Sequence, residues 1–248
     1  MTAHSLPYLL DNLRLTTFIK HHELYAKKCR ESNQSHEDYL YQLAKEECDF
    51  RECSRIKKLI SKAKFPFRKT LSDYDFSQIK NLKKETIVKL SECKFISKAQ
   101  NICLLGQTGT GKTHLAVSIG LEACKKGFSV LFYSAAHLVN LLLEAQSKLT
   151  ISRLHLRLHK ASLIIVDELG YLPLSKEGSE LLFQFFSERY EKSSVIITSN
   201  LEFSDWTKFM GDPTMTSALL DRITHHSHIH TLNGDSYRLK NRKKKGGD

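Results

Sequence analysis

The segment Gly106–Thr113 constrains the fold of this chain more than any other part of its sequence. It matches the pattern G-x-x-x-x-G-K-[ST], follows the apolar run Ile102–Leu105 and precedes a helical pattern. Glycines in such a loop let backbone amides wrap phosphate groups, and the N-terminus of the following helix adds its positive dipole. We therefore predict a P-loop in which Lys112 reaches the β and γ phosphates and the Thr113 hydroxyl binds Mg²⁺. The residues expected to contact the nucleotide are Gly106, Gln107, Thr108, Gly109, Thr110, Gly111, Lys112 and Thr113.

Two adjacent acids follow a second apolar run. The run Leu163–Val166 ends in Asp167 and Glu168. We expect Asp167 to hold Mg²⁺ through water, and Glu168 to lie at the exposed edge and polarise the attacking water. P-loop kinases of small molecules rarely need such an adjacent glutamate, whereas hydrolytic motors and switches do. The pair therefore favours nucleotide hydrolysis.

A third apolar run, Val195–Thr198, leads into Ser199 and Asn200. If this run lies beside the other two, Asn200 would orient water between Glu168 and the γ-phosphate; the alternative is an asparagine that only forms a turn. No N-K-x-D motif for reading guanine occurs in the sequence. ATP is therefore favoured over GTP.

From Asn101 onward, short β runs alternate with helical patterns, which is typical of a parallel sheet covered on both faces. The expected strands are Ile102–Leu105, Val130–Tyr133, Leu163–Val166, Val195–Thr198 and His228–Thr231. The expected helices lie around His114–Lys126, Ala136–Gln146, Ile151–Lys160, Gly178–Tyr190 and Thr216–Thr224. These patterns predict an α/β domain with a five-stranded parallel sheet over residues 99–248.

Residues 1–66 are predicted to form a small all-helical domain. A helical pattern runs from Ser5 to Tyr25, a polar gap follows at Arg30–Ser35, and a capping box of Ser35 and Asp38 is expected to start the next helix. Phe65 and Pro66 are expected to end that helix. Residues 67–98 are interpreted as a connector with one further short helix.

The net charge of +11 suggests a polyanionic partner. Residues 51–70 hold eight Lys or Arg and one acid, residues 141–160 hold four and one, and residues 237–248 hold six and one, so the rest of the chain is net negative. None of these segments is an amphipathic stripe rich in Trp, Phe and Leu, so DNA is favoured over a membrane. The alternative is solvated lysine faces and a basic tail. Candidate DNA contacts are a helical ridge of Arg51, Arg55, Lys58 and Lys62, a second group of Lys148, Arg153 and Arg157, and the tail Lys243–Lys245.

The composition is that of a soluble globular protein, with 41% hydrophobic and 26% charged residues. The first ten residues lack the basic start and long apolar stretch of a signal peptide, so a cytoplasmic location is expected. Cysteines in that compartment stay reduced, and the absence of CxxC pairs argues against a zinc site. We interpret all six as structural: Cys29, Cys48, Cys53, Cys93, Cys103 and Cys124. Trp206 is interpreted as a packing residue rather than a base-stacking one.

Together these motifs resemble the AAA+ ATPases, and the segments between them resemble the IstB-like ATP-binding proteins of bacterial insertion sequences, with DnaC-type helicase loaders as the nearest relatives outside that family. The segments that carry the resemblance are residues 109–116, 166–173 and 218–222, the pair His225-His226, and residues 236–238. The resemblance implies a homo-oligomer that assembles on double-stranded DNA with ATP and Mg²⁺, hydrolyses the ATP and presents the DNA to a transposase. It also implies a nucleoid-associated bacterial protein.

The same resemblance gives Arg222 a role as an arginine finger that reaches the nucleotide of a neighbouring subunit; an ion pair with Asp221 is the structural alternative. The segment after Thr231 is too short for the helical lid of many AAA+ proteins, and Arg238 is a candidate to replace the lid arginine.

His228 and His230 alternate with the His225-His226 pair, but no carboxylate or cysteine is close in sequence, so no metal site is expected there. The alternatives for function are a replicative helicase loader and, from another class, a P-loop kinase of a small metabolite.

Overall fold

We describe a computed structural model of the protein, in which residues 5–76, 79 and 82–234 are placed. The chain divides into two compact units, Met1–Lys58 and Leu59–Asp248, and each is described by itself. The division falls within one long helix, so residues 59–66 of the predicted helical domain pack with the second unit. Arg238 and the Lys243–Lys245 tail lie outside the described residues.

The N-terminal unit is helical, as predicted. Its helices are α1 (Leu6–Asn12), α2 (Thr16–Glu31) and the first part of α3 (His36–Ala63). The predicted capping box starts α3: the Ser35 hydroxyl accepts the amide of Asp38 at 3.0 Å, and the Ser35 amide donates to the Asp38 carboxylate at 3.1 Å. The expected helix over Ser5–Tyr25 is wrong in one respect, because it breaks between α1 and α2, where Arg14 takes a left-handed φ of 55°.

A buried carboxylate joins α2 to α3. Glu47 is 5% exposed and accepts hydrogen bonds from the Thr17 amide at 2.9 Å and from the Arg51 Nε at 2.7 Å. The other end of the Arg51 guanidinium donates to the Arg14 carbonyl at 2.7 Å. Burial raises the pKa of the Glu47 carboxyl, but the hydrogen bonds from Thr17 and Arg51 outweigh it, so the pKa is lowered. Glu47 therefore stays ionised and holds the two helices together.

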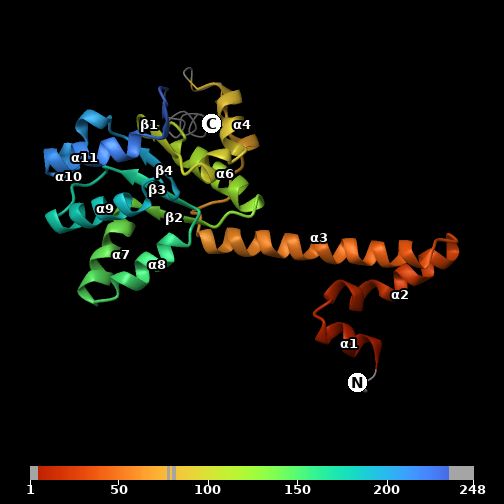
Figure 1. Ribbon diagram of the computed structural model, residues 1–248. Helices are drawn as coiled ribbons and strands as arrows, with labels where there is room; N and C mark the ends of the chain where they lie inside the picture. The colour runs from red at the N-terminus through yellow and green to blue at the C-terminus, as the bar shows by residue number, and fades with distance from the viewer. Residues whose placement is uncertain (1–4, 77–78, 80–81, 235–248) are drawn as a thin grey trace, which may run out of the picture. The chain divides into compact units, whose positions relative to one another are not determined.

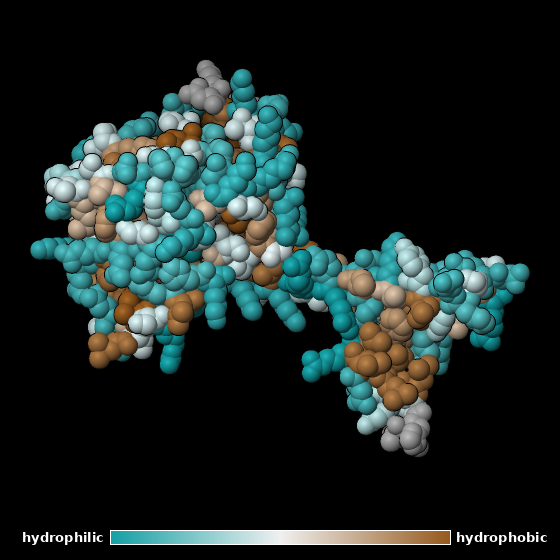
Figure 2. Space-filling view, in the orientation of Figure 1, coloured by the Kyte–Doolittle hydropathy of each residue, from teal (hydrophilic) through white to brown (hydrophobic). Residues whose placement is uncertain are grey.

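Apolar side chains remain exposed on the first helix of this unit. Leu6, Leu9 and Leu13 are 51%, 50% and 65% exposed, and Figure 2 shows the apolar surface that gathers over this part of the chain. Contiguous exposed apolar surface on a small unit typically marks an interaction site.

The second unit contains the predicted five-stranded parallel sheet (Figure 1). The strands are β1 (Asn101–Leu105), β2 (Val130–Ser134), β3 (Leu163–Leu169), β4 (Ser194–Ser199) and β5 (Ser227–Thr231). Their order across the sheet is β2-β3-β4-β1-β5, with every neighbouring pair parallel. The order places β1, β3 and β4 side by side, so the polar residues that follow them meet at one edge.

Helices cover both faces of the sheet. Alternate residues of a strand therefore pack into two different cores, one on each face. In β3, Leu163 and Ile165 pack into one core, and Ile164 and Val166 pack into the other. The first core also contains residues of α4 (Lys84–Ser91), α5 (Lys94–Ser97) and α6 (Lys112–Lys125). The second contains residues of α7 (Ala135–Ser147), α8 (Ile151–His159), α9 (Lys176–Arg189), α10 (Thr207–Met210) and α11 (Pro213–Thr224).

Trp206 is fully buried in the second core, where its ring lies 5.2 Å from Phe203 and 5.5 Å from Phe209, which confirms its interpretation as a packing residue. The thiols of all six cysteines are free, and Cys48 and Cys53 are the two exposed ones. None of the described helices is both long enough and apolar enough to span a membrane.

Candidate functional site

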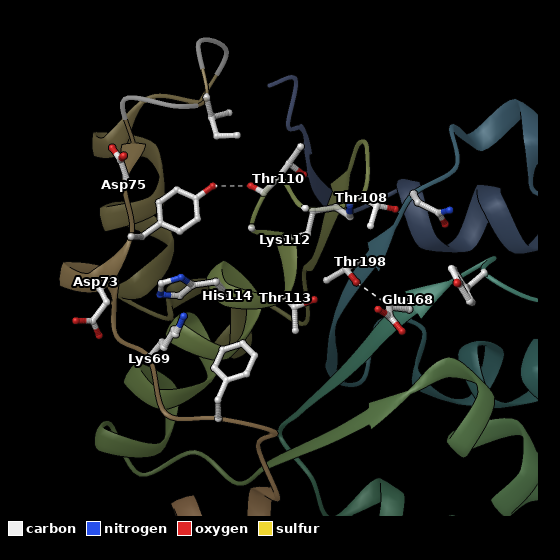
Figure 3. A pocket seen from close by; sticks show the side chains of 17 residues that line it. Lys69, Asp73, Asp75, Thr108, Thr110, Lys112, Thr113, His114, Glu168 and Thr198 are labelled. Atoms are coloured by element: carbon white, nitrogen blue, oxygen red, sulfur yellow. Dashed lines mark hydrogen bonds between the residues drawn. The ribbon is translucent and has the colours of Figure 1, made fainter. Parts of the chain in front are cut away.

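A pocket opens where β1, β3 and β4 end, between the P-loop and the segment that precedes α4 (Figure 3). Its lining comprises the P-loop residues Thr108–Thr113 with His114, the strand-end residues Glu168, Tyr171, Thr198 and Asn200, and the connector residues Phe67, Lys69, Asp73, Tyr74, Asp75 and Ile79. The structure therefore brings together three motifs that the sequence spreads from Gly106 to Asn200.

The P-loop connects β1 to α6 through backbone conformations that require glycine. Gly106 has a φ of 135°, and a Cβ at this position would lie 2.3 Å from the Leu232 carbonyl oxygen. Gly111 caps α6 with a φ of 87°. The Lys112 Nζ donates to the carbonyls of Gly106 at 2.6 Å and Gln107 at 2.8 Å. Gly106 and Gln107 thus hold the lysine, while Thr108–Thr113 face the pocket.

Asp167 lies at the centre of a hydroxyl network. It is 6% exposed and accepts the Thr113 hydroxyl at 2.9 Å and the Thr198 hydroxyl at 2.6 Å. The hydroxyl and carboxylate oxygens of Thr113 and Asp167 are the hard donors that Mg²⁺ prefers, so these two residues fit the predicted magnesium site.

Glu168 is turned out of the sheet by a register irregularity between Val166 and Leu169. Its φ is 59°, which is rare for a residue with a side chain, and its amide donates to the Thr198 hydroxyl at 2.9 Å. The irregularity turns the exposed Glu168 side chain into the pocket, whereas its neighbour Asp167 stays buried. Such strained positions cluster at functional sites because the surrounding structure must hold them.

Sequence reasoning missed Thr198. Its hydroxyl accepts from the Glu168 amide and donates to Asp167, so it couples the two acids. Asn200, which was predicted to orient water, is exposed and lines the same pocket. In the sequence, the polar run Thr198-Ser199-Asn200 at the end of a buried strand could have indicated this role. Thr198, the first residue of the run, is the one that reaches the two acids.

The connector supplies the wall opposite the strand ends, which sequence reasoning also missed. The Tyr74 hydroxyl donates to the Thr110 carbonyl at 3.0 Å, and burial raises its pKa to about 12, so it stays protonated. The Tyr74 ring lies 5.2 Å from that of His114, and the Phe67 ring lies 6.4 Å from His114 on another side. Aromatic faces beside a phosphate-binding loop suit the base of a nucleotide. In the sequence, the aromatic residues between Phe65 and Phe76 could have indicated this wall of the pocket.

His114 ties the connector to α6. Its Nε2 lies 2.9 Å from the Thr70 carbonyl, and burial lowers its pKa while the Thr70 bond opposes that shift. A neutral imidazole that donates from Nε2 satisfies this carbonyl at neutral pH.

Arg222 lies outside this pocket. Its guanidinium stacks over the Phe183 ring at 4.9 Å and donates to the Ala218 carbonyl at 2.8 Å. Arg222 is not among the described residues that line the nucleotide pocket of its own chain.

The candidate DNA contacts divide into two groups. All four members of the α3 ridge are exposed, but Arg51 is bound to Glu47, and Arg55 is paired with Glu52 at 2.8 Å. The other group, Lys148, Arg153 and Arg157, is exposed and lines one cleft between α7 and α8. In that cleft the Lys148 ammonium is paired with Glu144 on the same helix.

Comparison with known proteins identifies close relatives over the full fold. Residues 8–245 match the family described as "IstB-like ATP binding protein". The chain is 33% identical over 243 residues to a protein of insertion sequence IS21 from Pseudomonas aeruginosa, covering 98% of this chain and 92% of that protein. It is 37% identical over 211 residues to a protein of insertion sequence IS5376 from Geobacillus stearothermophilus, covering 85% and 84%.

Solved structures share the fold of a large part of the chain. The DnaC helicase loader superposes with a TM-score of 0.55 at 22% identity, covering 66% of this chain and 96% of that one. AMPPCP-bound DnaA from Aquifex aeolicus superposes with a TM-score of 0.56 at 24% identity, covering 71% and 54%. These structures therefore share the α/β fold of this chain. The family match over residues 8–245 confirms the resemblance to the IstB-like proteins that was inferred from the motifs.

Proposed function

Because the chain belongs to the family of IstB-like ATP-binding proteins, we propose that it is an ATPase that assembles on double-stranded DNA as a homo-oligomer and presents that DNA to a transposase. The observation that carries the hydrolytic part of this proposal is the network at the strand ends. Thr198 links the buried Asp167 to Glu168, whose side chain lines the pocket beside the P-loop. We place this activity in the bacterial cytoplasm, at the nucleoid.

Different residues of the pocket would bind the phosphates, the base, the metal ion and the attacking water. Amides of the P-loop and the Lys112 ammonium would bind the phosphates, and the aromatic wall of Tyr74 would face the base. Thr113 and Asp167 would hold Mg²⁺, which when bound neutralises phosphate charge. Glu168 would orient and deprotonate the attacking water, and Asn200 would position that water from β4.

Assembly is proposed because the described strand-end residues of the pocket, Glu168, Tyr171, Thr198 and Asn200, offer no second positive group beside Lys112 for the γ-phosphate, while Arg222 lies elsewhere on the same unit. An arginine that serves a neighbour's nucleotide makes hydrolysis depend on assembly. The exposed leucines of α1 offer an apolar surface for self-association.

DNA is proposed to contact the two basic groups. Lys148, Arg153 and Arg157 line one cleft, which suits a row of phosphates. All four ridge residues of α3 are exposed, but Arg51 and Arg55 are already paired with acids, so Lys58 and Lys62 are the ridge residues proposed to contact DNA. Contacts of this kind bind the backbone and carry no base-reading pattern, so binding would be insensitive to sequence.

The test is phosphate release from ATP with and without duplex DNA. Wild-type protein should release phosphate faster with DNA; Lys112→Ala should lose ATP binding, and Glu168→Gln should bind ATP without turning it over. Glu180→Gln, an exposed glutamate on α9, is the matched control and should behave as wild type. Phosphate transfer to a small acceptor with no effect of DNA would favour the kinase alternative, and recovery of a replicative helicase instead of a transposase from cells would favour the helicase loader.

A further inference from the structure

Three potential metal ligands that are distant in sequence converge on one surface of the second unit. Glu191 lies in the turn after α9, and His225 and His226 follow the last residue of α11. The Glu191 carboxylate lies 3.6 Å from the His226 Nε2 and 3.9 Å from the His225 Nδ1, and all three ligand atoms lie within 4.8 Å of one another. The cluster is remote in the fold from the nucleotide pocket, because it sits where β4 and β5 begin rather than where the strands end.

No metal site was expected from the sequence, but the structure brings a carboxylate to the histidine pair. Glu191 is far from the histidines along the chain, and only the packing of α9 against α11 brings it to them. The other two histidines do not belong to the cluster. His228 contacts the Gln100 side chain at 3.2 Å, and burial lowers the pKa of His230.

The spacing of these atoms suits a tetrahedral transition-metal ion. Zinc–nitrogen bonds of about 2.0–2.1 Å and zinc–oxygen bonds of about 2.0–2.2 Å place neighbouring ligand atoms about 3.4 Å apart. The two separations from the Glu191 carboxylate, 3.6 and 3.9 Å, lie within about half an ångström of that value, and the separation of the two histidine nitrogens is no more than 4.8 Å. All three side chains are about half exposed, at 55%, 53% and 50%, so they are free to move and leave a fourth position to water.

The Tyr190 hydroxyl occupies one side of the cluster. It lies 2.8 Å from the His225 Nδ1, in the place where a metal would approach that nitrogen. Tyr190 would give up this contact with His225 when a metal binds.

We propose that Glu191, His225 and His226 form a binding site for one divalent transition-metal ion of the Zn²⁺ class. Imidazole nitrogens with one carboxylate oxygen select such ions over Mg²⁺ and Ca²⁺, which prefer oxygen ligands. Bound metal would join the end of α9 to the end of α11. Both helices also contact Arg222. Arg222 belongs to the last turn of α11, and its guanidinium stacks on Phe183 of α9.

The test uses the full-length protein without an affinity tag, stripped of metal with EDTA. Zn²⁺ titration should give one saturable site per chain by calorimetry, and Co²⁺ in its place should give visible absorption bands. Glu191→Gln, His225→Asn and His226→Asn should each weaken binding by about tenfold or more, since even loss of a residue behind a ligand costs about 10–100-fold. His228→Asn is the matched control and should bind as wild type.

The variants also separate this site from other metal-binding groups of the chain, such as the exposed Cys48 and Cys53 or the Asp167 carboxylate. Because all three ligands are exposed, the variants should fold, which circular dichroism checks. Zn²⁺ should raise the melting temperature of wild type and of His228→Asn, and should raise it less in the three ligand variants. Absence of saturable binding, or equal binding by wild type and the three ligand variants, would overturn the proposal.

Discussion

Replacing Thr198 by Val tests whether the hydroxyl between the two acids organises the site. The change keeps the shape of a side chain that is 1% exposed, and it removes the donor to Asp167 and the acceptor for the Glu168 amide. A hydrogen bond to an ionised group contributes about 1.5–3 kcal/mol, and an unsatisfied buried donor costs about 1–3 kcal/mol. Asp167 keeps the Thr113 hydroxyl, and the Glu168 amide is only partly buried, so we expect a loss of about 2 kcal/mol.

A loss of that size lowers the melting temperature of a protein of this length by about 4–8 °C. The effect on turnover should be larger than the effect on ATP affinity, because Thr198 acts on the two acids and not on the P-loop amides. Misplacing a reacting group by about 1 Å costs about 10²-fold in rate, so we expect a loss of that order in kcat.

The assays are thermal unfolding, ATP binding and steady-state phosphate release below the melting temperature of the variant. Ser179→Ala is the matched control, since its hydroxyl is also buried and donates to the Met210 carbonyl at 2.9 Å, between α9 and the residue that ends α10. The control should lose stability and keep its turnover. Equal turnover by the Thr198 and Ser179 variants would refute the coupling of Asp167 to Glu168 through this hydroxyl.

Three further predictions concern assembly, DNA and pH. Arg222→Ala should bind ATP and lose turnover by about 10³-fold, and mixing it with Glu168→Gln protein should restore part of the activity; no gain where mixed oligomers form would count against a shared site. Replacing Lys58 and Lys62 together by Ala should flatten the salt dependence of log K for duplex DNA by about 2, at roughly 0.9 per phosphate contact, and an unchanged slope would make them solvated side chains. The folded-state pKa of Glu47 is lowered, so its contribution to stability is present above the carboxyl's ordinary pKa and is lost as pH falls through the folded value; the stability difference between wild type and Glu47→Gln, measured by urea unfolding, should therefore shrink on acidification, and a constant difference would contradict this.

Local patterns in the sequence were sufficient for the core of the fold and for the main chemistry. The strand β1, the glycine-rich turn and α6 follow from an apolar run, residues that tolerate positive φ and a helical period, all within about twenty-five residues. The capping box at Ser35 is equally local, because its two hydrogen bonds span three residues. Asp167 and Glu168 were identifiable because they end a buried strand.

Contacts between distant segments could not be read in the same way. Tyr74 reaches the P-loop across 36 residues, Thr198 reaches Asp167 across 31, and Glu191 meets the histidine pair only through the packing of α9 and α11. Arg51 looked like a member of a basic ridge until the structure paired it with the buried Glu47. Propensity, periodicity and capping act over one or two turns of chain, and they determined the elements and the P-loop. Which side chains from different elements come within hydrogen-bonding distance depends on the crossing of helices and the order of strands, and only the tertiary structure decided that.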